Sequence, residues 1–170
     1  MHAIAIIPGT KTLRLVERAD PVVQSPEEIK LKVIHVGICG TDREEAVGGR
    51  ALAPAGQTDL VLGHEMLGQV VETGADVKRV RPGDFAVLTV RRGCAKCLPC
   101  QMNRSDMCLT GQYRERGIWG MDGYQCEYVV DREQYVVRVP PEISTIGVLT
   151  EPMSVAAKAI YEALQLQQAR

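Results

Sequence analysis

Residues 94–108 read C-A-K-C-L-P-C-Q-M-N-R-S-D-M-C and hold four of the six cysteines of this 170-residue chain. The two-residue gaps between the first three let their thiols turn toward one point. Four thiolates complete the tetrahedral shell that zinc prefers, and a closed shell is typical of a structural site. Bacterial ferredoxins, the nearest alternative, end their spacing in C-x3-C-P, whereas here the last gap is seven residues and Leu109 follows. The cysteines therefore predict a structural zinc lobe over about residues 91–110, with the ligands Cys94, Cys97, Cys100 and Cys108.

Charge and hydropathy exclude several classes of partner. The 20 Lys+Arg and 21 Asp+Glu residues give a net charge of −1, which argues against binding to nucleic acid or to an anionic membrane. Mean hydropathy is −0.07, and no apolar run reaches the roughly 18–20 residues of a membrane helix. No basic segment precedes the short apolar run at the N-terminus, so we expect no secretion signal and a cytoplasmic protein.

Short strands separated by turns dominate the chain up to residue 140. The stretch Ile29–Val36 places apolar residues at every second position, which is typical of a half-buried strand. The other expected strands are Met1–Ile7, Leu13–Glu17, Phe85–Val90, Gln125–Val130 and Tyr135–Val139. The run Val61–Glu72 is apolar and interrupted by glycine. A short helix is expected at Thr41–Val47, and a longer one follows Thr150-Glu151-Pro152, with Thr150 as its cap. The pattern predicts a mainly β fold with short helices: a β-barrel followed by one helix.

A second set of metal-ligand types lies upstream of the lobe. Cys39 stands in G-I-C-G-T-D and His64-Glu65 in G-H-E-M-L-G, with Glu151 much later in the chain. A catalytic zinc takes about three protein ligands and keeps one exchangeable position. Taken singly, Cys39 fits a buried small residue, His64-Glu65 a surface pair, and Glu151 a helix N-terminus. Spacing alone does not bring these residues together.

A dinucleotide fingerprint is missing from the sequence. No G-x-G-x-x-G occurs, so the chain lacks the βαβ unit that binds a nicotinamide cofactor through that motif.

The motifs in their order resemble the zinc-dependent medium-chain dehydrogenase family over essentially the whole chain. They are C-G-T-D, G-H-E-x2-G, the four-cysteine window and E-P-M-S-V at 151–155. Within that family, T-V-R-R-G-C at 89–94, E-R-G-I at 115–118 and M-D-G-Y at 121–124 resemble the glucose 1-dehydrogenase branch. The resemblance implies a GroES-like β-barrel catalytic domain at residues 1–150. It also implies that 151–170 begin the helix that connects to a Rossmann domain, which is absent here.

The resemblance also implies an activity and its residues. Zinc on Cys39, His64 and Glu65, with Glu151 as a labile fourth ligand, would act as Lewis acid while hydride passes from sugar C1 to NAD or NADP, giving the lactone. Thr41 would relay the proton, and Thr41, Thr89, Glu115 and Glu151 would contact the sugar. The cofactor would bind through the absent domain, so we expect the chain alone to be inactive. We also expect its exposed apolar surface to favour a homo-oligomer.

Two other functions remain open at this point. One is a GroES-like zinc module that binds a partner or ligand and catalyses nothing. The other is a sorbitol, polyol or other alcohol dehydrogenase of the same family.

Overall fold

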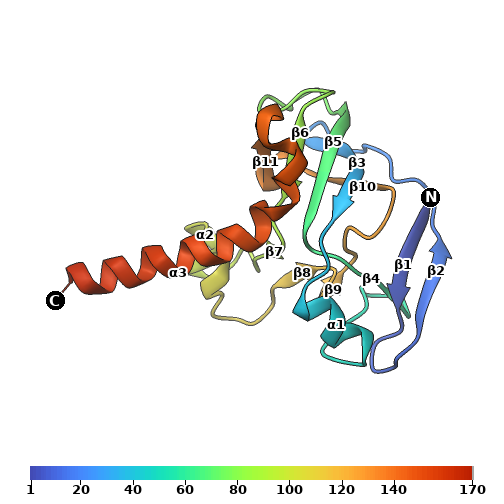
Figure 1. The fold of residues 1–170 in the computed structure, drawn as a ribbon, viewed down its shortest axis with the longest axis horizontal. Helices are drawn as coiled ribbons and strands as arrows, with labels where there is room; N and C mark the ends of the chain where they lie inside the picture. The colour runs from blue at the N-terminus through green and yellow to red at the C-terminus, as the bar shows by residue number, and fades with distance from the viewer. Residues whose placement is uncertain (170) are drawn as a thin grey trace.

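The computed structural model describes residues 1–169, which form three small sheets with short helices between them (Figure 1). The strands are β1 (His2–Ile6), β2 (Leu13–Glu17), β3 (Glu28–Val36), β4 (Leu60–Val61), β5 (Met66–Thr73), β6 (Phe85–Leu88), β7 (Arg91–Arg92), β8 (Arg114–Arg116), β9 (Gly120–Met121), β10 (Tyr128–Arg132) and β11 (Val136–Val139). The α-helices are α1 (Gly40–Ala46), α2 (Leu98–Gln101) and α3 (Thr150–Gln168), and the 3-10 helices are η1 (Ser105–Met107), η2 (Glu133–Tyr135) and η3 (Pro141–Leu149). The predicted fold class, mainly β with short helices, is confirmed.

The central sheet has the strand order β10-β3-β5-β6-β11, with every neighbouring pair antiparallel. The strand predicted at Ile29–Val36 is confirmed as β3, and Ile29 and Leu31 are fully buried in its first half. Between Val33 and His35 the register to β5 shifts, and Ile34 is exposed. Since β3 ends at Val36, this sheet fixes where the G-I-C-G-T-D motif begins.

The apolar, glycine-interrupted run Val61–Glu72 contributes to two strands in different sheets. β4 pairs with β1 in the sheet β2-β1-β4, whereas β5 joins the central sheet. Residues 62–65 between them leave both ladders, and Gly63 takes a φ of 91°. The break places His64 and Glu65 at the junction of the two sheets.

The third sheet, β7-β8-β9, carries the cysteine lobe and is joined to the central sheet by a buried charge cluster. Asp131 of β10 accepts from Arg92 of β7 at 2.5 Å and from Arg116 of β8 at 2.7 Å. All three residues are buried. One carboxylate shared by two guanidinium groups fixes the root of the lobe against the sheet, because breaking such a buried pair leaves an uncompensated charge.

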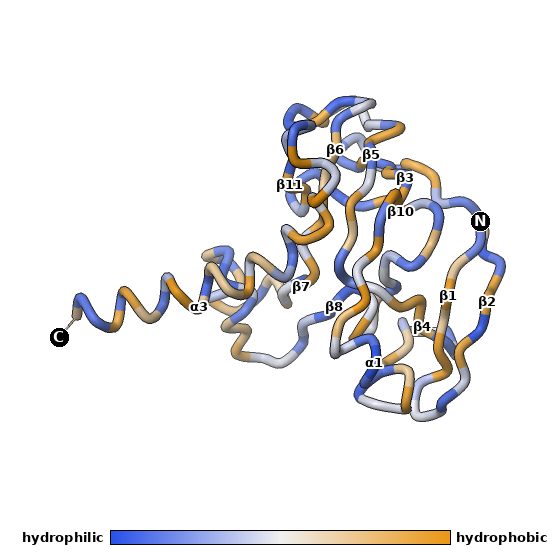
Figure 2. The backbone as a smooth tube through the Cα atoms, in the orientation of Figure 1, coloured by the Kyte–Doolittle hydropathy of each residue, from blue (hydrophilic) through white to orange (hydrophobic). Residues whose placement is uncertain are grey.

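Helix α3 leaves the body of the molecule, and none of its residues up to Gln168 is buried (Figure 1). Apolar residues recur along its exposed length (Figure 2). The prediction that Thr150 caps this helix is wrong. Leu149 occupies the N-cap without a side-chain hydrogen bond, since the Thr150 hydroxyl instead donates to the Gly147 carbonyl at 2.7 Å in η3. No helix within residues 1–169 is long and apolar enough to span a membrane.

Candidate functional site

The four cysteines of the lobe converge as their spacing suggested. Their sulfur atoms all lie within 4.8 Å of one another. The Thr110 hydroxyl and the N–H groups of Cys97 and Lys96 lower the pKa of Cys94 to about 5. Gly93 packs against the cluster, since a Cβ there would lie 2.7 Å from Cys100 Sγ. Four convergent thiols, one of them held readily as thiolate, fit a tetrahedral zinc ion.

Cys39, His64 and Glu65 form a second group whose ligand atoms lie within 4.8 Å of one another. Cys39 Sγ is 3.1 Å from His64 Nε2, and His64 and Glu65 are buried. A thiol, an imidazole and a carboxylate facing one point fit a catalytic zinc, which keeps an open position beside three protein ligands.

Helix α1 explains why Cys39 points into this group. Cys39 is its N-cap: the sulfur accepts from the Thr41 N–H at 3.2 Å, and Asp42 Oδ2 accepts from the Cys39 N–H at 2.9 Å. This reciprocal pair satisfies two N–H groups that a helix start leaves free. The C-G-T-D motif is therefore a local folding unit that fixes the orientation of the Cys39 thiol.

Close contacts at glycine residues position His64 and Glu65. A Cβ on Gly37 would lie 2.1 Å from Glu65 Oε2, so the carboxylate occupies the space that any side chain at Gly37 would need. At Gly63, the carbonyl oxygen would lie 2.2 Å from a Cβ on either Gly117 or Gly123. The sequence singled out Gly37 and Gly63 as parts of motifs, but it carried no signal that Gly117 and Gly123 pack against Gly63.

Asp42 is a site residue that the sequence reasoning missed. Its Oδ1 lies 3.7 Å from His64 Nδ1, both side chains are buried, and neither of these two atoms has a hydrogen-bond partner. A carboxylate behind a histidine favours the proton on Nδ1, which leaves Nε2 free for a metal. The available signal was that Asp42 ends the G-I-C-G-T-D motif, which does not by itself reveal the contact with His64.

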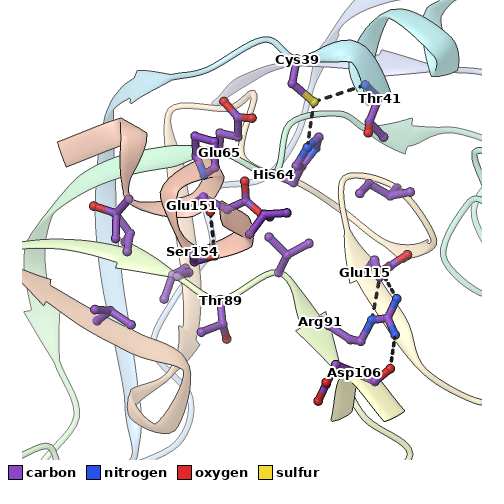
Figure 3. A pocket seen from close by; sticks show the side chains of 18 of the residues that line it. Cys39, Thr41, His64, Glu65, Thr89, Arg91, Asp106, Glu115, Glu151 and Ser154 are labelled. Carbon is purple, nitrogen blue, oxygen red and sulfur yellow. Dashed lines mark hydrogen bonds and ion pairs between the residues drawn. The ribbon is translucent and has the colours of Figure 1, made fainter. Parts of the chain in front are cut away.

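An open pocket of about 630 Å³ brings the predicted residues together (Figure 3). Those that line it are Cys39, Thr41, His64, Glu65, Thr89, Glu115 and Glu151. Glu151 reaches the pocket from the first turn of α3 but lies outside the three-ligand group. Burial raises the pKa of Glu151; His64 opposes that shift, while Glu65 and Asp42 add to it.

Thr89 and Glu115 stand on the side of the pocket formed by the third sheet. Glu115 Oε1 accepts from Arg91 Nη2 at 2.7 Å and from Arg91 Nε at 3.1 Å. The Thr89 hydroxyl lies 3.2 Å from Arg92 Nη1, and the Thr89 carbonyl accepts from the Tyr124 hydroxyl at 3.1 Å. The predicted sugar contacts therefore have fixed positions. Arg91, which the sequence reasoning did not single out, also lines the pocket.

Comparison with known proteins finds relatives that match nearly the whole chain. The family described as "Alcohol dehydrogenase GroES-like domain" matches residues 25–141. The chain is 41% identical to a glucose 1-dehydrogenase of Methanocella arvoryzae over 170 residues, covering 99% of this chain and 47% of that protein. It is 43% identical to glucose 1-dehydrogenase 2 of Vulcanisaeta moutnovskia, covering 100% and 47%.

Solved structures give the same result. Glucose dehydrogenase of Haloferax mediterranei, solved with NADP, Zn and gluconolactone, superposes with a TM-score of 0.90 at 36% identity. The match covers 100% of this chain and 47% of that one. The chain thus spans about half the length of the relatives it matches.

Proposed function

The chain belongs to the alcohol dehydrogenase GroES-like domain family, and we propose that it is the catalytic domain of a zinc-dependent glucose 1-dehydrogenase. The observation that carries this proposal is one open pocket that gathers both kinds of residue. Around it stand three ligand types suited to a catalytic zinc and two polar residues, Thr89 and Glu115, suited to sugar hydroxyls. The glucose 1-dehydrogenases among its relatives support glucose as the substrate.

In this proposal the chain supplies about half of the enzyme. Residues 1–150 form the catalytic domain, and residues 151–170 begin the helix that leads to a cofactor-binding domain. That domain would hold NAD or NADP, as the Haloferax structure with NADP and Zn suggests.

Cys39, His64 and Glu65 would hold the catalytic zinc, with Glu151 as the exchangeable fourth ligand, and the lobe cysteines would hold the structural one. The catalytic ion, when bound, supplies Lewis acidity that lowers the pKa of a sugar hydroxyl. Asp42 keeps the proton on His64 Nδ1, so that Nε2 remains a ligand atom.

Thr41 would take the proton that leaves the sugar C1 hydroxyl and pass it toward solvent. The nicotinamide held by the other half of the enzyme would supply the acceptor for the hydride from C1, so that the product is the lactone. Glu115 accepts a hydrogen bond from one sugar hydroxyl. The Thr89 hydroxyl forms a hydrogen bond with a second sugar hydroxyl. A site that bonds to hydroxyls rejects analogues that lack them, because its buried polar groups would then be unpaired.

The test is to join residues 1–170 to the cofactor-binding half of the Methanocella arvoryzae relative and to follow reduced nicotinamide. We expect glucose oxidation, its loss in Cys39→Ala, and its retention in Cys126→Ala, a matched cysteine outside the pocket. A folded, zinc-loaded fusion that oxidises no glucose would contradict the proposed function. Turnover that survives in Cys39→Ala would contradict the zinc chemistry.

A further inference from the structure

The cysteine lobe forms one wall of the pocket, although its metal site is separate from the catalytic group. Ser105 and Asp106 of η1 line the pocket beside Arg91 and Glu115. The segment that carries η1 lies between Cys100 and Cys108, two of the four convergent thiols. The metal bound by these thiols would therefore fix both ends of the segment that forms this wall.

Arg91 connects that segment to the predicted sugar contact. Its Nη1 donates to the Asp106 carbonyl at 3.3 Å, while Nε and Nη2 both donate to Glu115 Oε1. The guanidinium carbon also lies 4.1 Å from the centre of the Tyr113 ring. The planar Arg91 guanidinium thus contacts Glu115, the Asp106 carbonyl and the Tyr113 ring. Lysine, with its single ammonium group, cannot reproduce this arrangement.

Glu115 depends on this guanidinium. The Glu115 residue is only 8% exposed, and Arg91 is its one ion-pair partner among residues 1–169. A buried carboxylate that loses its only partner is strongly destabilised, and it must turn toward water or toward another cation. If η1 loses its fixed position, Arg91 loses the Asp106 carbonyl and Glu115 loses its fixed orientation.

We propose that Arg91 is a positioning residue that couples metal occupancy of the four-cysteine site to the sugar affinity of the pocket. The proposal rests on the proposed function, because it takes Glu115 as a sugar contact. In it, the metal orders η1, the Asp106 carbonyl of η1 orients the guanidinium, and the guanidinium holds the Glu115 carboxylate toward the sugar. The lobe then contributes to substrate binding as well as to stability.

The first measurement needs no sugar. In the zinc-loaded chain, we follow by NMR the Arg91 Nε–H and the Glu115 carboxylate carbon, and then repeat this in Cys108→Ser, which removes one lobe ligand. We expect the Arg91 proton to exchange rapidly with water in the variant and the Glu115 signal to shift. Methyl signals of the buried residues Leu31 and Val129 serve as the control for an intact central sheet. Unchanged Arg91 and Glu115 signals in a lobe that has lost its metal would overturn the proposal.

The second measurement is titration of the same zinc-loaded chain with glucose. We expect Arg91→Lys, which keeps all four lobe ligands and the positive charge, to weaken glucose binding about tenfold. Arg114→Lys, a matched change at the neighbouring exposed residue of β8, should leave it unchanged. An Arg91→Lys affinity equal to that of the unmodified chain would overturn the proposal.

The two measurements separate the two claims. If the unmodified chain gives no glucose-induced shift while Arg91 still responds to the lobe metal, the proposed function fails and the link to sugar affinity fails with it. If glucose binds but the Arg91 signal does not change when the lobe loses its metal, the proposed function stands and only the coupling is wrong.

Discussion

The side chains of the candidate site are oriented by contacts with near neighbours in sequence and with residues distant in sequence. Cys39 is fixed by the cap of α1, and Glu65 packs against Gly37. The ligand types of Cys39, His64 and Glu65 were visible in the sequence, and the resemblance to zinc-dependent medium-chain dehydrogenases implied that they share one metal. The role of Asp42 behind His64 could not be predicted, because it depends on how β3, α1 and the loop before β5 meet.

Replacement of Asp42 tests this arrangement at the residue scale. Asp42→Ala should weaken zinc binding at the Cys39 group about tenfold or more, and loss of the cap should lower the free energy of unfolding by about 1 kcal/mol. Competition with a chromophoric chelator and urea denaturation measure the two effects. Asp42→Asn keeps a capping oxygen and should recover most of the stability but not the metal affinity. Unchanged metal affinity in Asp42→Ala would show that Asp42 does not act on His64.

Cys126 and Tyr124 give a prediction for alkaline pH. Burial raises the pKa of Cys126 from 9.0 to about 11 and that of Tyr124 from 10.0 to about 12. Between pH 9 and 11 the unfolded chain releases the Cys126 proton while the folded chain keeps it, so the free energy of unfolding falls as pH rises. The loss approaches about 1.4 kcal/mol per pH unit for one such group, and it is absent below pH 9.

Urea denaturation at several pH values, compared between the unmodified chain and Cys126→Ala, measures this slope. The variant should lose less stability between pH 9 and 11, and Tyr124→Phe should flatten the curve at higher pH. Parallel curves for all three proteins would mean that neither buried group sets the alkaline limit.

At the scale of the elements, local patterns predicted most strands but not the contacts between segments that are remote in sequence. The strand at Leu13–Glu17 has the predicted bounds, and β3 differs by one residue. The sequence does not show that β4 and β5 join different sheets, because the break between them depends on the packing of Gly63 against Gly117 and Gly123, which are remote in sequence. The capping error at Thr150 has a similar origin, since η3 offers the Thr150 hydroxyl a carbonyl that the sequence pattern does not reveal.

The close packing of Gly117 and Gly123 against the Gly63 carbonyl can be tested with two alanine substitutions. A Cβ at Gly123 would lie 2.2 Å from the Gly63 carbonyl oxygen and 2.5 Å from that of Leu62, and both are backbone atoms that cannot rotate away. Gly123→Ala should therefore lower the free energy of unfolding by about 3 kcal/mol or more and displace His64. Gly56→Ala is the control, because its φ is +81° but no atom lies within 4 Å. It should cost only about 1–2 kcal/mol of left-handed strain. An equal loss of unfolding free energy in the two variants would contradict the claim that the Gly63–Gly123 contact stabilises the fold.

For the molecule as a whole, α3 is a long helix with no buried residue up to Gln168. Its side chains reach the rest of the structure through charged contacts with the lobe, where Lys158 Nζ lies 2.7 Å from Asp106 Oδ2 and Arg104 lies 3.5 Å from Glu162. Met153, Val155, Ile160 and Leu164 are exposed along it. The start signals at Thr150-Glu151-Pro152 predicted the helix, but its lack of apolar packing was visible only in the structure.

This exposed apolar face of α3 predicts self-association of the chain. Sedimentation velocity should show a mass that rises with protein concentration. Ile160→Lys combined with Leu164→Lys should reduce that rise, whereas Leu15→Lys on β2, which is also exposed, should not. A concentration-independent monomer would contradict the expectation of a homo-oligomer.

The central claim is that one chain carries two separate zinc sites, one of which faces the pocket. Elemental analysis of the purified chain tests it most directly, with Cys39→Ala and Cys108→Ser measured beside it. We predict two zinc ions per chain, one for each ligand group, and one ion in each variant. A single ion that persists in Cys39→Ala and disappears in Cys108→Ser would mean that Cys39, His64 and Glu65 hold no metal, and would contradict the account.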